Sequence, residues 1–268
     1  MLKLVACAAS SLLKSYKSSL FDPWLELEDS FGFRSTFFFF PDNASIHHKY
    51  DGTWYRHHDK VVLEGRVINV ADLMKELARR GWEIGLHGTY CSFDDSGELQ
   101  RQKKQVELSL GHEIVSIRQH FLHFDITKTP RAQSDAGFKY DTTLGFNFLI
   151  GFRNGIALPF YHYDLQADNP LPLLQIPLNL QDGALLSSKS MDLGPGLAVK
   201  YAKELIDKVE KTNGLVTLLW HPDSCIYPHW FWVYKELLKY VATKEAWVAP
   251  VREIGAWWEQ RRQILQVY

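Results

Sequence analysis

Three histidines each follow an apolar segment that has the length and composition of a buried strand. They are His87, His120 and His221. The segments are Trp82–Leu86, Glu113–Arg118 and Leu215–Trp220. In α/β proteins, ligands and catalytic groups collect at the carboxyl ends of parallel strands. Neutral imidazole binds zinc-like metals, and its pKa suits proton transfer near neutral pH.

Each of these histidines taken alone is more often a structural residue than a functional one. Three at successive strand ends, with Arg118 ending one of the same strands, are better explained by a shared site. The sequence has neither a nucleophile elbow of the Ser/His/Asp type nor a glycine-rich phosphate loop. Metal-assisted hydrolysis is therefore the chemistry that the residue types favour.

The elements that must position these side chains alternate between strand and helix from Arg34 onward, which predicts an α/β fold with a mostly parallel sheet. The expected strands are Ser35–Phe40, Glu83–Leu86, Ile114–Ile117, Tyr140–Thr143, Leu173–Leu178, Val216–Leu219 and Ala246–Ala249. The expected helices cover 24–30, 69–80, 97–110, 129–137, 197–213 and 228–244, with a final helix that contains Trp257 and Trp258.

Local signals set several boundaries. Asp22 before Pro23 predicts a capped helix start, and Asp95 with Glu98 predicts a capping box. Residues 41–68 contain turn-forming residues and four histidines, which predicts a long loop whose histidines are solvated.

Composition narrows the class of protein. A chain of 268 residues with 46% hydrophobic content fits one domain over 1–268, with a helical segment at 1–21. A net charge of -1 gives no reason to expect nucleic acid or an acidic membrane as partner. We expect no membrane span and no cleaved signal, and hence a cytoplasmic protein. Three scattered cysteines do not form a disulfide framework. The oligomeric state is not predicted.

Five blocks in order resemble one known family. The runs STFFFF, GWEIGLHGTY, RQHF, AGFKYDTTLGF with GFRNG, and LLWHP are similar to the NodB-homology polysaccharide deacetylases, carbohydrate esterase family four. The RQH block is typical of a divergent bacterial branch, and the resemblance covers roughly residues 22–262. It implies a distorted (β/α) barrel and a hydrolase that removes N-acetyl groups from a carbohydrate by cleaving a linear amide C–N bond.

The resemblance also implies a divalent metal, usually zinc, held by an aspartate and two histidines. Matched by position, His87 is the first metal histidine and His221 is the acid that protonates the departing amine. Arg118 matches the arginine that orients the catalytic base, and Asp141 falls near the aspartate that tunes the catalytic histidine. Tyr90, Arg153 and Trp220 are candidate substrate-binding residues.

Two departures from the family pattern bear on activity. Cys91 stands where the second metal histidine should be, and we favour His120 over Cys91 as the replacement ligand. No segment in 1–21 matches the first motif, whose strand end supplies an anionic ligand and the general base. The resemblance therefore predicts a barrel that lacks its first strand, with weak or absent turnover. The remaining candidates for a base are Asp141, Asp94 and Asp95.

Two alternatives to an active enzyme remain open from the sequence. One is a degenerate deacetylase-like domain that binds carbohydrate without hydrolysing it. The other is a truncated fragment of a longer protein.

Overall fold

The computed structural model describes residues 20–42, 48–50 and 55–266. The helical segment expected over 1–21 lies almost entirely outside these ranges. The described chain is an α/β structure with a six-stranded sheet, as the alternation of elements predicts. In sheet order the strands are β1 (Thr36–Phe39), β4 (Glu83–Gly88), β5 (Ser116–Gln119), β6 (Tyr140–Asp141), β8 (Asn169–Gln175) and β7 (Phe160–Asp164). All pairs are parallel except β7 with β8.

A second, two-stranded sheet pairs β9 (Leu180–Gln181) with β10 (Leu218–Leu219) in parallel. The mostly parallel α/β class is therefore confirmed, and no closed barrel is detected within the described ranges. The strands expected at Ser35–Phe40, Glu83–Leu86, Ile114–Ile117 and Val216–Leu219 all overlap observed strands.

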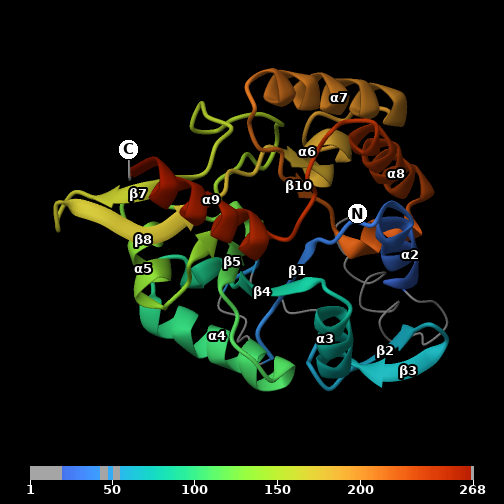
Figure 1. The fold of residues 1–268 in the computed structure, drawn as a ribbon. Coiled ribbons are helices and arrows are strands. Elements are labelled where there is room, and N and C mark those ends of the chain that lie inside the picture. Colours follow the sequence, from blue (N-terminus) through green and yellow to red (C-terminus); the bar gives the residue numbers. More distant parts are fainter. Residues whose placement is uncertain (1–19, 43–47, 51–54, 267–268) are drawn as a thin grey trace.

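The helices cover the sheets in two groups, as Figure 1 shows. The helices α3 (Val70–Arg79), α4 (Ser96–Leu110) and α5 (Thr129–Asp135) lie along the larger sheet, and α9 (Val251–Gln266) crosses near β7 and β8. The other group is α2 (Asp22–Phe31), α6 (Asp182–Leu186), α7 (Pro195–Lys211) and α8 (Pro228–Ala242). Short 3₁₀ turns follow three strand ends: η1 (Tyr90–Ser92), η2 (His120–Leu122) and η3 (Pro222–Ile226). Of the helices in the described ranges, none has the length and apolarity to cross a bilayer.

The region expected to be a long loop contains an antiparallel hairpin of β2 (Lys60–Leu63) and β3 (Arg66–Asn69). Its turn residues Glu64 and Gly65 both have positive φ, 50° and 73°, as a tight hairpin turn requires. Val61 and Leu63 are buried on one face, and this alternation is the pattern that the loop prediction overlooked.

Two other local predictions need correction. Residues 246–249 form no strand. Asp22 does not cap α2; it is the first residue of that helix, and its carboxylate accepts the Glu64 amide at 3.0 Å instead. The predicted cap at Asp95 is confirmed, because its carboxylate accepts the Glu98 amide at 2.9 Å.

The main core lies between the larger sheet and the helices α3 and α4. Leu77, Trp82, Leu86 and Leu99 are fully buried there, because the helices present apolar side chains every three to four residues. A separate apolar cluster joins α6, α7 and α8 next to β9.

Two buried carboxylates tie helices from distant parts of the chain to the sheet. Glu83, at the start of β4, accepts hydrogen bonds from Ser116, Thr36 and the Arg252 amide at the start of α9. Burial raises the pKa of this carboxyl, and the bonds partly offset the cost.

Glu28 of α2 makes a second such junction. It accepts hydrogen bonds from the Trp82 indole at 2.7 Å, the Tyr234 hydroxyl of α8 at 2.9 Å and the Ser35 hydroxyl at 2.9 Å. Burial raises the pKa of this carboxyl as well. The first strand, α2 and α8 therefore meet at one side chain.

Two leucines of α4 test the placement of the core. Leu99 is fully buried, and Leu99→Ala should lower the free energy of unfolding by about 2–5 kcal/mol through lost burial and a cavity. Leu108 on the same helix is 74% exposed, and Leu108→Ala should change it by less than about 0.5 kcal/mol. Urea denaturation of the two variants gives both values. Equal effects would contradict the assignment of the buried face.

Candidate active site

The register of β1, β4 and β5 brings two of the predicted site residues to the same level. Phe39 pairs with Leu86, and His87 pairs with Arg118. Phe40, which follows β1, therefore lies beside His87, with ring centroids 4.5 Å apart. Side chains of paired residues in parallel strands point to the same face of the sheet. His87 and Arg118 consequently share one face at the strand ends.

His87 and His120 form a close pair, with ring centroids 5.1 Å apart and near-perpendicular planes. His87 Nδ1 lies 2.9 Å from the Arg118 carbonyl oxygen, which can only accept, so Nδ1 donates and Nε2 keeps its lone pair. Burial lowers the pKa of His87 well below its ordinary value, and His120 lowers it further. His87 is therefore neutral at physiological pH.

This pair partly fits the zinc site that the resemblance implies. A neutral imidazole with Nδ1 bonded to a carbonyl is a good metal ligand. Catalytic zinc, however, takes three protein ligands. In the described part of the chain, no three His, Cys, Asp or Glu side chains are grouped to hold a metal ion. At most two nitrogen ligands can come from this pair, fewer than the three that catalytic zinc takes.

The third histidine has a buried acid as its partner. His221 Nδ1 lies 2.8 Å from one carboxylate oxygen of Asp182, and the His221 amide donates to the other at 2.8 Å. The pairing of Leu219 with Gln181 brings the ends of β9 and β10 together, so Asp182 follows one strand end and His221 lies two residues beyond the other. The Asp182 carboxylate raises the pKa of His221 to about 9, with a smaller contribution from Asp223.

His221 is thus an imidazolium at neutral pH with one nitrogen still available. Nδ1 is used by Asp182, and 56% of the side chain is exposed, so Nε2 can meet a substrate. The charge of His221 makes a small contribution to the lowered pKa of His87. Sequence reasoning missed Asp182. Its signal was an acid and a glycine directly after a short apolar run.

Asp141 is placed differently from the expectation that it tunes the catalytic histidine. It pairs in register with Ile117, the residue before Arg118, and so points to the opposite face of the sheet. Its carboxylate accepts bonds from the Gln133 amide, the Thr143 amide and the Thr143 hydroxyl. Desolvation raises its pKa to about 6.

Arg118 is buried on the histidine face. Its Nε donates to the Thr142 hydroxyl at 2.9 Å, and its guanidinium lies 4.6 Å from the centre of the Phe38 ring. Phe38 can occupy this position because Gly85 has no side chain; a Cβ on Gly85 would lie 2.7 Å from the ring. Desolvation lowers the pKa of Arg118 to about 10, so it remains charged at neutral pH.

A rim of aromatic rings adjoins the histidine pair. Tyr90, a predicted substrate residue, stacks between His48 and His123, with centroids 4.5 and 4.1 Å away. Phe121 follows His120, is 42% exposed and stacks on Tyr50 at 4.5 Å. Its backbone lies in the left-handed region at φ 59°, a strained conformation often found at functional sites.

The other predicted substrate residues have packing partners of their own. Arg153 donates from Nη1 to the Gly145 carbonyl at 3.1 Å. Trp220, directly before His221, donates to the Trp230 carbonyl at 3.3 Å and packs against Tyr234. Substrate contact by Tyr90, Arg153 and Trp220 stays a prediction.

The remaining candidates from the sequence are Cys91 as a metal ligand and Asp94 and Asp95 as bases. Cys91 is exposed in η1, whereas His120 is the residue that lies beside His87. Asp95 caps α4, and Asp94 pairs with Lys128 at 3.3 Å. These two acids therefore have structural partners.

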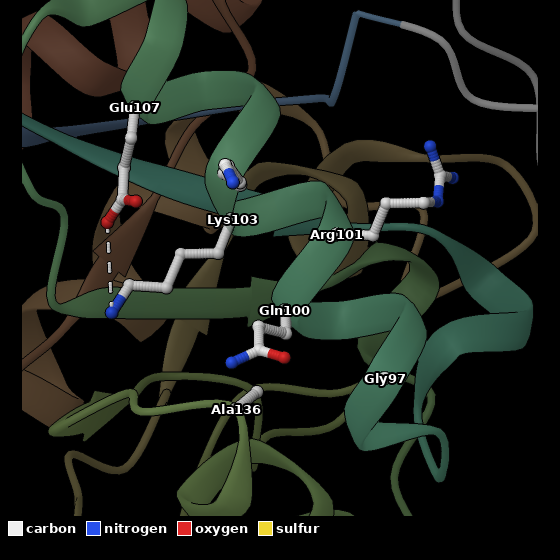
Figure 2. Close-up of a pocket in the computed structure, with 7 residues that line it drawn as sticks. Gly97, Gln100, Arg101, Lys103, Glu107 and Ala136 are labelled. Atoms are coloured by element: carbon white, nitrogen blue, oxygen red, sulfur yellow. Dashed lines mark ion pairs between the residues drawn. The ribbon is translucent and has the colours of Figure 1, made fainter.

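A pocket on the helical layer is distinct from this site. Figure 2 shows it on α4, opposite Ala136 at the end of α5. Its cation Lys103 pairs with Glu107 at 3.7 Å and with Glu113 at 3.3 Å, and Arg101 pairs with Glu98. These ion pairs engage Lys103 and Arg101, and none of the candidate site residues lines the pocket.

Solved structures with the same fold include hydrolases. The chain is 20% identical to a protein from Mycobacterium smegmatis assigned as a polysaccharide deacetylase, covering 89% of this chain and 76% of that one, with a TM-score of 0.63. For Puue allantoinase the identity is 17%, the coverage 93% and 75%, and the TM-score 0.65.

A third structure, assigned as a polysaccharide deacetylase from Pseudomonas aeruginosa PAO1, is 14% identical, with coverage of 92% and 75% and a TM-score of 0.60. No family model matches the sequence, and no curated protein matches it either. The chain therefore has the polysaccharide deacetylase fold, which it shares with allantoinase.

The buried Asp141 makes stability depend on pH. Its folded pKa of about 6 exceeds the ordinary 3.8, so between about pH 4 and pH 6 the folded state retains a proton that the unfolded state has lost. Stability should therefore fall as pH rises through this window, by up to about 3 kcal/mol from this residue.

The variant Asp141→Asn keeps the side-chain shape and removes this titration. Urea denaturation at pH 4 and pH 6.5 should show a smaller fall for the variant than for the wild type. Identical falls would show that Asp141 is not a buried acid with a raised pKa.

Proposed function

We propose that this protein is a hydrolase that cleaves the amide bond of N-acetylated sugars. The observation that supports this most directly is the Asp182–His221 pair, which holds an accessible imidazolium at the end of β10. The shared fold supports the same chemistry, because its relatives are assigned as polysaccharide deacetylases and an allantoinase.

In this proposal His221 is the general acid. Hydrolysis adds water to the acetamide carbonyl, breaks the C–N bond and releases acetate and an amine. The departing nitrogen must gain a proton, which His221 donates from Nε2 while Asp182 holds Nδ1. The imidazolium is the abundant form below about pH 9, so the acid is ready at neutral pH.

In this proposal the attacking water lies beside His87 and His120. His87 Nε2 has a lone pair that can accept a hydrogen bond from that water, and Arg118 provides positive charge near the carbonyl oxygen as it becomes negative. His87 is a weak base because its pKa is well below the ordinary value. We therefore expect slow turnover from the described residues alone.

The proposal also includes the barrel and the metal site that the resemblance implies. The two sheets would form a distorted barrel, and His87 with His120 would be the histidine ligands of zinc or another divalent metal. When bound, such a metal would lower the pKa of a water molecule and polarise the carbonyl. The third ligand would have to come from outside the His87–His120 pair.

A second candidate is a carbohydrate-binding domain without turnover. It is favoured by the absence, in the described ranges, of a metal-ligand group and of a carboxylate hydrogen-bonded to His87. The aromatic rim would then bind sugar rings while no hydrolysis follows. Acetate release separates the two functions.

The assay measures acetate release from N-acetylated chitooligosaccharides, with and without added zinc. The wild-type protein should release acetate slowly, and His221→Gln should reduce the rate by about 100-fold or more because the leaving amine loses its acid. His112→Gln is the matched control, since His112 is exposed on the α4–β5 loop, and it should leave the rate unchanged. Sugar binding with no acetate release under any condition would favour the binding domain instead.

The Asp182–His221 pair predicts the alkaline limb of the pH profile. In the wild type, activity should fall above about pH 9, where His221 loses its proton. Asp182→Asn removes the negative charge and should move the pKa of His221 down toward its ordinary value of 6.5, so the fall begins at lower pH. Histidine NMR titration measures the pKa directly. An unchanged His221 pKa in the variant would show that Asp182 does not tune it.

A further inference from the structure

The guanidinium of Arg118 is a buried cation without a carboxylate in contact. Arg118 is 8% exposed, and no described Asp or Glu oxygen lies within 4.0 Å of its nitrogens. The charge of Asp141 raises the pKa of Arg118, but the Asp141 oxygens accept hydrogen bonds from Gln133 and Thr143 instead. Removing a guanidinium from water is costly unless a counter-ion compensates.

The hydrogen bonds of Arg118 leave one edge of its planar group unused. Both bonds in the described structure come from Nε, to the hydroxyl and the carbonyl oxygen of Thr142. The ring of Phe38 covers one face at 4.6 Å. The two Nη nitrogens form the remaining fork, and such a fork matches the two oxygens of a carboxylate.

Arg118 also acts on the candidate active site. Its charge lowers the pKa of both His87 and His221. The acid Asp182 is already engaged by His221, so it neutralises that imidazolium rather than the guanidinium. Among the described residues, Arg118 therefore has no carboxylate within ion-pair distance, and its unused Nη nitrogens favour an anionic ligand.

We propose that Arg118 is a carboxylate-binding residue of this site, which holds the two oxygens of a small carboxylate between its Nη nitrogens. The carboxylate has two possible sources: the acetate released by hydrolysis, or the carboxylate of an acidic sugar. Only the choice between these sources rests on the proposed function. The binding itself needs no turnover.

The test titrates the resting protein with sodium acetate and follows binding by saturation-transfer NMR. Arg118→Met removes the fork and should weaken acetate binding by at least about tenfold. Arg118→Lys keeps the charge without the fork and should weaken it several-fold. Arg131→Met is the matched control, because Arg131 is exposed and already paired with Asp135 and Asp164, and it should bind as the wild type does.

Three ligands, namely acetate, methyl glucuronoside and acetamide, show whether the site binds a carboxylate and which molecule carries it. Acetate binding supports the product carboxylate, and binding of methyl glucuronoside without acetate supports an acidic sugar. Acetamide, the neutral isostere of acetate, should bind more weakly than acetate. Acetamide binding as tight as acetate binding would overturn the proposal, as would no binding of either carboxylate at concentrations on the order of 100 mM.

Folding of the variants is checked by thermal melting. If Arg118→Met does not fold, Arg118→Lys decides: acetate affinity equal to that of the wild type would overturn the proposal. The acetate-release assay gives an independent answer on function. If the protein binds carboxylates but releases no acetate, the proposed activity is wrong and the carboxylate site at Arg118 still holds. If it releases acetate but does not bind carboxylates, the proposed activity holds and the carboxylate site is wrong.

Discussion

The in-register parallel pairing of β1, β4 and β5 is the constraint on which the candidate site depends. Because side chains in a strand alternate between faces, a shift of the register by one residue would turn every side chain of that strand to the opposite face. The observed register aligns Phe39 with Leu86 and His87 with Arg118. It therefore places the histidine and the arginine on one face and leaves the leucine to the helical core. The glycine at position 85 then lets an aromatic ring pack under the guanidinium.

The charges at this site divide into two groups with different roles. His87 and His120 form a close, half-buried pair, and desolvation lowers the pKa of His87. His221 and Arg118 are cations, and among the described residues His221 has a carboxylate in contact whereas Arg118 has none. Burial strengthens the electrostatic effects around Arg118, whereas the exposed side of His221 meets solvent. The result is a site suited to substrates and intermediates that develop negative charge.

Sequence reasoning predicted the parallel sheet and the strand ends at His87 and Arg118, because long apolar runs between glycines are strong local signals. It missed Asp182, since β9 has only two residues and the pairing with His221 depends on contacts 39 positions apart. It also placed Asp141 near the catalytic histidine. The side to which Asp141 points is set by its pairing with Ile117, which only the three-dimensional register reveals. The hairpin was overlooked because polar residues around it resemble a loop.

Glu28 has a consequence for how the chain folds. Its carboxylate bonds Tyr234, 206 positions away, and Trp82, 54 positions away. Closing such long loops is entropically unfavourable, so contacts of this kind form late and slow the overall rate. If α2 packed on the sheet before α8, the Glu28 carboxylate would lose water without gaining the hydrogen bond from Tyr234. We infer that α2 and α8 add to the sheet together in a late cooperative step, whereas the neighbouring strands β4 and β5 can pair early through the shorter α4 connection.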